Sequence, residues 1–420
     1  MKKSLFGRDA VTPEKEYVMD YVHQVYEPTG DLVFPIGSTA PAVSIGDAVL
    51  AGQALCLDNE GRPCVFCSCS GTVKAIERRS DGCAETPSIV VENDRKFKTA
   101  EGIGKKTDWM ELSRTEILRR IRDGGAVGIM PRRYPRAAKL DRLAADGISR
   151  IVIDGTEWEP YISSDDDILR TYSFGVVSGL KILMRLFPGT EGVILIGDDK
   201  PLAKTYIRYA IGVGTGIRIL ETPAGKPIGN EKQIGRLLSG KLDPSAVVIS
   251  PAEANAVYDA VRRATPFIRR IVTVAGTAVK NPGNYLVRIG TSCAELLAAT
   301  GGLRSGVHTD RAVLGGALTG VPLSSLDVPI QKDSGALLLF AEEAPEQSTE
   351  CIRCGRCARI CPAQLKPMLL LKAAEQGDMA AFAKKLNGGE CIDCGACSWI
   401  CPAKRPLASM IACGLALTGR

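Results

Sequence analysis

The sequence has little of what brings a protein to nucleic acid or across a membrane. Aromatic residues make up only 5% of its 420 residues, and its formal net charge of +6 is spread without a long basic block. Nucleic-acid binding relies on clustered cations and stacking surfaces, so we expect no nucleic-acid partner. The stretch closest to a membrane helix, LASMIACGLALTG, is shorter than the roughly 18 apolar residues required, so we expect a packed helix there and no transmembrane segment.

Signal-peptide features and histidine are also scarce. The opening residues, MKKSLFGRDAVTPEKE, include two lysines but lack the apolar run of a secretory signal, so we expect a cytoplasmic protein. The two histidines, His23 and His308, have no sequence neighbours suited to catalysis or metal binding. We expect each to be an ordinary surface or turn residue.

Cysteine, in contrast, is abundant. The chain has fifteen cysteines, and eight of them lie between residues 351 and 401. In an exported protein such clustering would indicate disulfides. In a reducing compartment it indicates metal binding.

The length and texture of the chain predict a multidomain α/β protein. Length alone suggests about three domains. Changes in composition divide the chain more finely, into a β domain, an α/β domain, a small α+β module and a cysteine-rich helical part. Their expected ranges are 1–105, 106–262, 263–335 and 340–420.

The first three parts carry strand and helix signals of different kinds. APAVSIGDAVLAGQAL and SGTVKAIERR predict short strands, in a pattern that resembles the small β-sandwich of biotinyl and lipoyl carrier domains. SRIVIDG, GVILIGDD, GIRILET and SAVVISP are short apolar runs between helical segments, which favours a parallel sheet. Ser113 and Ser250 are expected helix caps. IRRIVTVAGTAVKNPGNYLVRIGTS predicts a hairpin around its NPGN turn.

The cysteine-rich part contains the same motif twice. CIRCGRCARICP begins at residue 351 and CIDCGACSWICP at residue 391, each with cysteine gaps of two, two and three before a proline. This spacing matches the two-cluster bacterial ferredoxin run, in which the fourth cysteine of each motif binds the other cluster. The sequence therefore predicts two [4Fe–4S] clusters. Their expected ligand sets are Cys351, Cys354, Cys357 and Cys401 for one cluster, and Cys391, Cys394, Cys397 and Cys361 for the other.

The flanking residues refine this prediction. Gly355 and Gly395 are expected to let the backbone approach the clusters. The first motif has arginines at 353, 356 and 359, whereas the second has Asp393. Positive charge stabilises the reduced cluster, so we expect the 351–357 cluster to have the higher potential. The alternatives are a pair of structural zinc sites and, for the arginines, a partner-docking face.

Two further patterns are weaker. Cys64, Cys67 and Cys69 form the run CVFCSCS without an evident fourth ligand, so buried or free thiols are favoured over a third metal site. GVGTG at 212–216 is similar to a phosphate-binding loop but precedes a strand. A helix-ending turn is therefore the better interpretation.

Taken together, these parts resemble the RnfC family, the peripheral NADH-handling component of the Rnf electron-transport complex, with cobalamin reductases and proline-reductase electron carriers as further relatives. The similar segments include VSIGDAVLAGQAL, DGTEWEPYISSD, RIVTVAGTAVKNPGNYLVRIGTS and CPAKRPL. The resemblance implies a barrel-sandwich hybrid at the N-terminus, a Rossmann-like domain similar to the flavin-binding part of complex I, and a β-grasp (SLBB-like) module before the ferredoxin-like tail.

The resemblance also implies a function. Such a protein passes electrons between NADH, through FMN, and ferredoxin-type or membrane redox partners, and lies peripherally on the inner face of the cell membrane. Expected partners are the other redox subunits of a membrane-associated complex, a ferredoxin-type carrier, or a partner reductase. The residues it places at FMN and NAD(H) are Gly128, Glu157, Glu159 and Lys200.

One segment departs from the family pattern. Where the family has a glycine-rich flavin loop, this chain has GGAVGIMPRRYPRAAKL at 124–140, in which bulky residues and Pro131 replace glycines. Side chains there would intrude on a flavin face, and proline removes an N–H donor. Loss or remodelling of the pocket is therefore expected. The alternative function is a divergent paralogue without flavin or NADH activity, acting as a cluster-bearing adaptor to a partner reductase.

Overall fold

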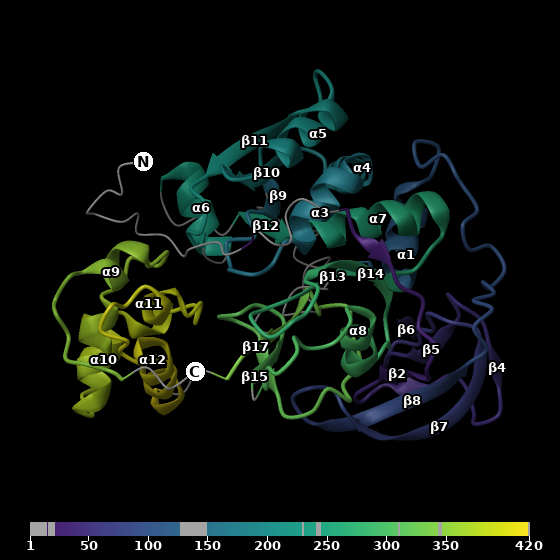
Figure 1. Cartoon of the computed structure of the whole chain (residues 1–420). Helices are drawn as coiled ribbons and strands as arrows, with labels where there is room; N and C mark the ends of the chain where they lie inside the picture. Colours follow the sequence, from purple (N-terminus) through teal and green to yellow (C-terminus); the bar gives the residue numbers. More distant parts are fainter. Residues whose placement is uncertain are drawn as a thin grey trace.

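The computed structural model describes residues 15, 22–126, 149–228, 231–240, 245–309, 311–342 and 347–418. Within these ranges the chain forms four sheets and, at its C-terminal end, a group of short helices (Figure 1).

The N-terminal part is a β-sandwich, as the sequence predicts. One sheet has the order β2 (Leu32–Pro35), β8 (Glu85–Asn93), β7 (Gly71–Ser80) and β4 (Ala48–Val49). The other has the order β3 (Ala40–Pro41), β5 (Ala54–Leu57) and β6 (Pro63–Phe66). Alternate residues of these strands, including Phe34, Leu55 and Ile89, meet in a buried core between the sheets.

The second part is a parallel α/β domain. Its sheet has the order β11 (Ile217–Thr222), β10 (Glu191–Gly197), β9 (Arg150–Gly155) and β12 (Ala246–Ile249). Its helices are α1 (Arg114–Asp123), α3 (Ser164–Thr171), α4 (Ser173–Leu186), α5 (Pro201–Ile211), α6 (Glu231–Ser239) and α7 (Pro251–Arg263). The apolar strands pack against α4 and α7, which explains why they read as uninterrupted apolar runs.

Local signals in this domain are confirmed. Ser113 accepts a hydrogen bond from Glu116 N, and Ser250 accepts one from Glu253 N in a complete capping box. Helix α5 ends at Gly212, whose φ of 71° begins the turn into β11, so GVGTG ends a helix as expected. The strand order also has a switch point: β10 and β11 lie on one side of β9, and β12 lies on the other. In such sheets ligands bind beyond the carboxyl ends of the strands at this point.

The third part is a sheet assembled from distant segments. Its order is β1 (Gln24–Val25), β14 (Gly283–Arg288), β13 (Arg269–Ala275), β17 (Ala336–Phe340), β15 (Arg311–Leu314) and β16 (Val321–Leu323), with α8 (Cys293–Ala299) packed on it. The expected hairpin is β13–β14. Two strands outside residues 263–335, β1 and β17, pair in parallel with β14 and β13.

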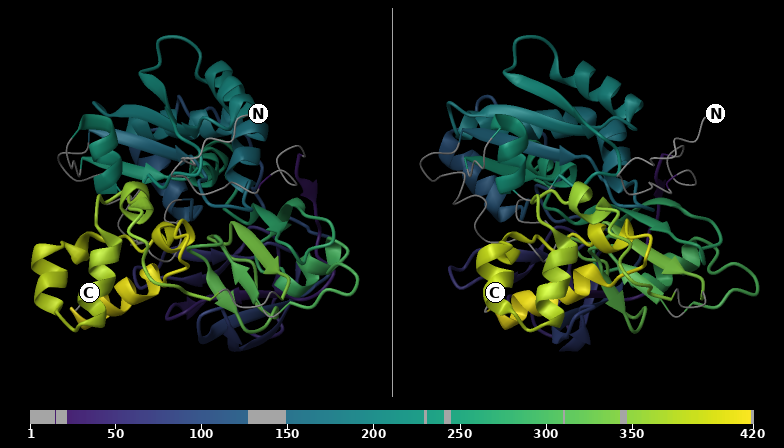
Figure 2. Two further views of the ribbon diagram at one scale, coloured as in Figure 1. Left: turned by 60° about the vertical axis from the view of Figure 1, so that its left-hand side comes forward. Right: turned by 90° about the vertical axis from the view of Figure 1, so that its left-hand side faces the viewer.

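The C-terminal part is helical. It comprises α9 (Arg356–Ile360), α10 (Pro367–Glu375), a π-helical turn η1 (Ala381–Lys385), a 3-10 turn η2 (Gly388–Glu390), α11 (Ala396–Trp399) and α12 (Leu407–Leu417). Each cysteine loop leads into a short helix and then a longer one, and these helices lie beside both the α/β domain and the six-stranded sheet (Figure 2). Across the described ranges, no helix is long and apolar enough to span a membrane.

Candidate functional site

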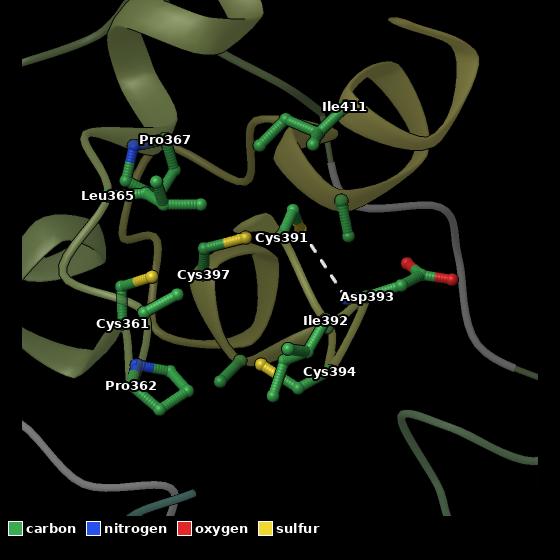
Figure 3. A pocket seen from close by; sticks show the side chains of 14 residues that line it. Cys361, Pro362, Leu365, Pro367, Cys391, Ile392, Asp393, Cys394, Cys397 and Ile411 are labelled. Carbon is green, nitrogen blue, oxygen red and sulfur yellow. Dashed lines mark hydrogen bonds between the residues drawn. The ribbon is translucent and has the colours of Figure 1, made fainter. Parts of the chain in front are cut away.

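Four cysteines from both motifs surround one hollow in the C-terminal part. Cys391, Cys394 and Cys397 come from the second loop, and Cys361 comes from the end of α9 in the first (Figure 3). The hollow holds about 420 Å³ of space free of protein atoms, its open mouth included, and apolar residues such as Leu365 and Ile411 complete its wall. The structure thus brings together the thiols that the crossed ligand pattern assigns to one cluster.

The loop around this hollow has the backbone shape that close approach requires. Asp393 and Gly395 have left-handed φ values of 54° and 72°. This turn aims the Asp393 N–H at Cys391 Sγ, 3.4 Å away. An N–H directed at a ligand sulfur stabilises negative charge on it.

The remaining four motif cysteines form a more exposed group. Cys357 is buried beside Leu371 and Leu407, and Cys401 packs against the same cluster. Burial first, and then the nearness of Cys401 and Cys354, raises the pKa of Cys357. Cys351 and Cys354 are exposed. The two groups therefore differ in their access to solvent.

The geometry fits iron–sulfur clusters better than zinc. Tetrahedral zinc would hold all its ligands at roughly 2.3 Å from one point. In the described part of the chain, no three His, Cys, Asp or Glu side chains converge in that way. Thiols spaced around a hollow instead suit a cubane that presents four separate irons. Burial raises the pKa of Cys394 to about 12, but a coordinating metal deprotonates its thiol ligand.

The other sequence candidates for metal binding take structural places. Cys67 and Cys69 are buried thiols in the sandwich core, with their sulfurs 3.8 Å apart. His23 differs from the expectation of a surface or turn residue, because its side chain is only 7% exposed. It stacks on Tyr172 and lies 3.0 Å from Asp167 Oδ1, held there by the segment that enters β1. His308 lies near the end of β17, where its carbonyl accepts Glu342 N.

Glu157 lies just beyond β9, at the switch point of the parallel sheet. Its carboxylate accepts hydrogen bonds from Asp165 N at 2.7 Å and Asp166 N at 3.3 Å, so it caps the N-terminus of α3. Burial, followed by the charge of Glu157, raises the pKa of Asp166 to about 6. A left-handed φ of 41° at Glu157 makes this turn possible.

Glu159 faces a different module. Its carboxylate accepts hydrogen bonds from Leu318 N at 2.9 Å, Thr319 N at 3.2 Å and the Thr319 hydroxyl. An added Cβ at Gly316 would lie 2.1 Å from Glu159 Oε2, so this approach requires glycine. The two glutamates of the EWEP segment therefore fix two different elements in place.

Two lysines lie at the same end of the sheet. Lys200, at the start of α5, is completely buried, with its ammonium 3.2 Å from Asp199 Oδ1. Lys15 is 2% exposed and donates to the carbonyl oxygen of Glu157. Burial lowers the pKa of Lys15 to about 8, an effect that nearby Lys200 reinforces and Glu157 opposes. The sequence had no signal for Lys15, whereas Gly128 and the segment MPRRYPR lie outside the described residues.

The second cysteine loop packs directly against this end of the sheet. Trp158 and Leu318 contact a small apolar cluster built on Ile360 and Ala396, which Cys394 also touches. An added Cβ at Gly395 would lie 3.1 Å from the carbonyl oxygen of Leu318. The predicted cluster site is therefore joined to the EWEP segment through one tryptophan and one loop.

Comparison with known families agrees with this construction. Family models match in four places: an RnfC barrel-sandwich hybrid domain at residues 13–96, an Nuo51 FMN-binding domain at 121–265, an SLBB domain at 271–322 and a 4Fe-4S dicluster domain at 345–402. Together they define an electron-transfer protein that combines a flavin domain with two iron–sulfur clusters. The predicted fold class and cofactor content are thereby confirmed.

The chain belongs to the RnfC family. It is 32% identical over 388 residues to the RnfC-type component of the proton-translocating ferredoxin:NAD(+) oxidoreductase complex of Clostridium ljungdahlii, covering 88% of this chain and 84% of that protein. It is 37% identical over 353 residues to the corresponding component of the ion-translocating oxidoreductase complex of Pseudomonas aeruginosa, covering 80% of this chain but only 45% of that one. A chain of NAD+-reducing [NiFe]-hydrogenase in the H2-reduced state has a TM-score of 0.49 and 17% identity, over 75% of this chain and 68% of that chain.

Proposed function

We propose that this chain is the peripheral component of an ion-translocating ferredoxin:NAD oxidoreductase complex, where it passes electrons between NADH and one-electron carriers. One contact carries the proposal: Trp158, between the two glutamates, packs against the apolar cluster that includes Cys394. A flavin held at the switch point would lie next to a cluster, without an intervening module. Nicotinamides exchange electrons in pairs and clusters one at a time, and a bound flavin converts between the two.

The cluster ligands follow from the thiol groupings. Cys361, Cys391, Cys394 and Cys397 share a hollow, and we assign them to the cluster that lies against the EWEP segment. The other set, Cys351, Cys354, Cys357 and Cys401, belongs to the more exposed cluster. Electrons would then pass from the flavin pocket to the first cluster and from there to the second, whose exposed loop offers a partner short access.

The pocket residues divide into two roles. Lys15 and Lys200 are buried cations at the carboxyl end of the sheet, and they are suited to hold the anionic parts of FMN or NAD(H). Glu157 and Glu159 instead act as positioning residues, because their carboxylates already hold α3 and the 318–319 backbone. We assign Gly128 to the adjoining flavin loop by its place in the sequence.

The partners follow from the relatives' roles. We propose that other redox subunits of a membrane complex and a ferredoxin-type carrier exchange electrons with the exposed cluster. The protein itself would lie on the inner face of the membrane.

Flavin content tests the proposal against the adaptor hypothesis. The protein would be purified without oxygen, its iron, sulfide and FMN measured, and NADH then added while flavin and cluster absorbance are followed. Stoichiometric FMN, with both clusters bleached by NADH, is the expected result. Two intact clusters without flavin, even after FMN is supplied, would favour the adaptor, and the MPRRYPR segment would then be the reason.

A further inference from the structure

A second group of thiols, far from the cluster motifs, lies in the N-terminal sandwich. Cys56 is on β5 and Cys64 is on the neighbouring β6, and their sulfurs are 2.8 Å apart. Cys56 is fully buried in the sandwich core, whereas Cys64 is half-buried. A disulfide has a sulfur–sulfur bond of about 2.05 Å, so the two thiols need to move by less than 1 Å to bond.

An irregularity in the strand pairing creates this contact. Cys56 pairs with Val65 and Leu57 pairs with Pro63, which leaves Cys64 as an extra residue on β6. In regular pairing, Cys64 would point to the face opposite Val65 and away from Cys56. A bulge redirects a side chain, and here it turns the Cys64 sulfur toward Cys56.

The pair is poorly placed to act as a structural crosslink. A disulfide stabilises a fold chiefly by closing a long loop, and here only a short hairpin separates the two cysteines. That hairpin is already closed: Asp58 N donates to Arg62 O at 2.8 Å, and Arg62 Nε donates to the Asp58 carboxylate at 2.9 Å. Because a covalent bond adds little stability here, the close thiols point to chemistry instead.

A lysine from another module lies over the pair. Lys332, in the segment between β16 and β17, directs its ammonium at Cys64 O at 3.4 Å and at Gly125 O at 3.3 Å, and it lies 5.5 Å from the Phe66 ring centre. Desolvation lowers the pKa of Lys332 to about 8, and negative charge on Cys64 or Cys56 raises it again. The ammonium therefore favours a thiolate at this pair, the form that attacks disulfides. It also joins the sandwich to the end of α1.

We propose that Cys56 and Cys64 form a reversible disulfide, a redox-sensitive site beside the joint that Lys332 makes between three modules. The oxidant is a low-molecular-weight disulfide. The more accessible Cys64 attacks it and releases one small thiol, and Cys56 then attacks the mixed disulfide and releases the second. Two protein thiols lose two electrons and two protons, and one small disulfide becomes two small thiols. Closing the bond pulls the bulge, and with it the carbonyl that Lys332 binds.

Thiol mapping in the intact holoprotein tests this site. The protein would be held without oxygen in mixtures of reduced and oxidised glutathione, quenched with acid, alkylated and digested after glutamate, which cuts the chain at Glu60 between the two cysteines. Mass spectrometry should find Cys56 joined to Cys64, in a yield that follows the glutathione ratio. A Cys67→Ser, Cys69→Ser background removes the neighbouring thiols from the same peptide. There Cys56→Ser should leave a glutathione adduct on Cys64.

The exposed Cys83 provides an internal standard for oxidant strength. The disulfide proposal is overturned if Cys56 and Cys64 remain fully alkylated under conditions that convert Cys83 completely to its glutathione adduct. For Lys332, we expect Lys332→Met to slow disulfide formation about tenfold, a change of roughly 1.4 kcal/mol in the barrier, and Lys332→Arg to restore the rate. An unchanged rate in Lys332→Met would overturn the role given to the lysine.

Discussion

The carboxylate of Glu159 accepts a hydrogen bond from Leu318 N at 2.9 Å and thereby joins the α/β domain to a loop of the six-stranded sheet. Leu318 in turn lies against the second cysteine loop, where Gly395 leaves no room for a side chain. One short path of contacts thus connects the segment after β9 with a cluster ligand loop. Changes along this path should alter electron transfer more than they alter the fold.

Gly395 offers the most direct test of that path. We expect Gly395→Ala to cost about 1 kcal/mol for the left-handed backbone and, in addition, to push the cysteine loop away from Leu318. Transfer from NADH to the clusters should slow by at least about tenfold, measured by stopped-flow absorbance. Gly377→Ala is the matched control, because Gly377 has a φ of 68° and no atom near its would-be Cβ. Equal rates in both variants would show that the contact does not set the transfer.

The two cluster sites should respond differently to the loss of one ligand. We expect Cys394→Ser to disrupt the cluster against the EWEP segment and so to prevent NADH from reducing the remaining one. Cys354→Ser should affect the exposed cluster while NADH still reduces the inner one. Iron analysis and EPR spectra after NADH addition distinguish the two cases. Full reduction of the remaining cluster in Cys394→Ser would reverse the proposed order.

The elements with local signals could be predicted, and the pairings between distant segments could not. The apolar runs of β9, β10 and β12 identified a parallel sheet, because strands buried on both faces have no polar alternation. The parallel pairing of β1 with β14 joins residues about 260 positions apart, and neither segment carries a mark of the other.

The candidate site shows the same division. Cysteine spacing predicted the crossed thiol sets because gaps of two and three residues express local ligand geometry. The functions of Glu157 and Glu159 could not be separated in this way. Their partners are α3 in one case and Leu318 in the other, about 160 residues away. Lys15 was missed because a single lysine in a polar segment has no distinguishing neighbours.

The buried lysine of α5 should matter for flavin binding. Lys200→Met removes a cation with no exposed surface at the carboxyl end of the sheet, so we expect FMN affinity to fall about tenfold or more. Equilibrium dialysis of the flavin-depleted protein measures this change. Lys204→Met, one turn along the same helix on a side chain that is 27% exposed, should bind FMN as the unchanged protein does. A similar loss in both variants would indicate a general effect of charge on the helix.

The raised pKa of Asp166 should make stability depend on pH. A carboxyl whose pKa rises from 3.8 unfolded to about 6 folded holds its proton more tightly in the folded state, so stability should fall as pH rises through this window. Between pH 5 and 7 we expect a loss of about 1 kcal/mol. Asp166→Asn should flatten that part of the profile, measured by thermal unfolding of the holoprotein. Asp327→Asn, on a side chain that is 70% exposed, should keep the original slope.

The two clusters should differ in reduction potential, with the higher value at the 351–357 loop. Arg353, Arg356 and Arg359 surround that loop, and Arg359 donates a hydrogen bond to Cys354 O at 3.1 Å. The other loop carries Asp393 and a more apolar wall. Because positive charge and solvent favour the more negative reduced state, electrons should collect on the exposed cluster, where a partner takes them. EPR-monitored redox titration gives both potentials, and replacing Arg353 and Arg356 with glutamine should lower only that of the exposed cluster. An easier reduction of the Asp393-loop cluster in the unchanged protein would contradict this order and assign the arginines to partner docking.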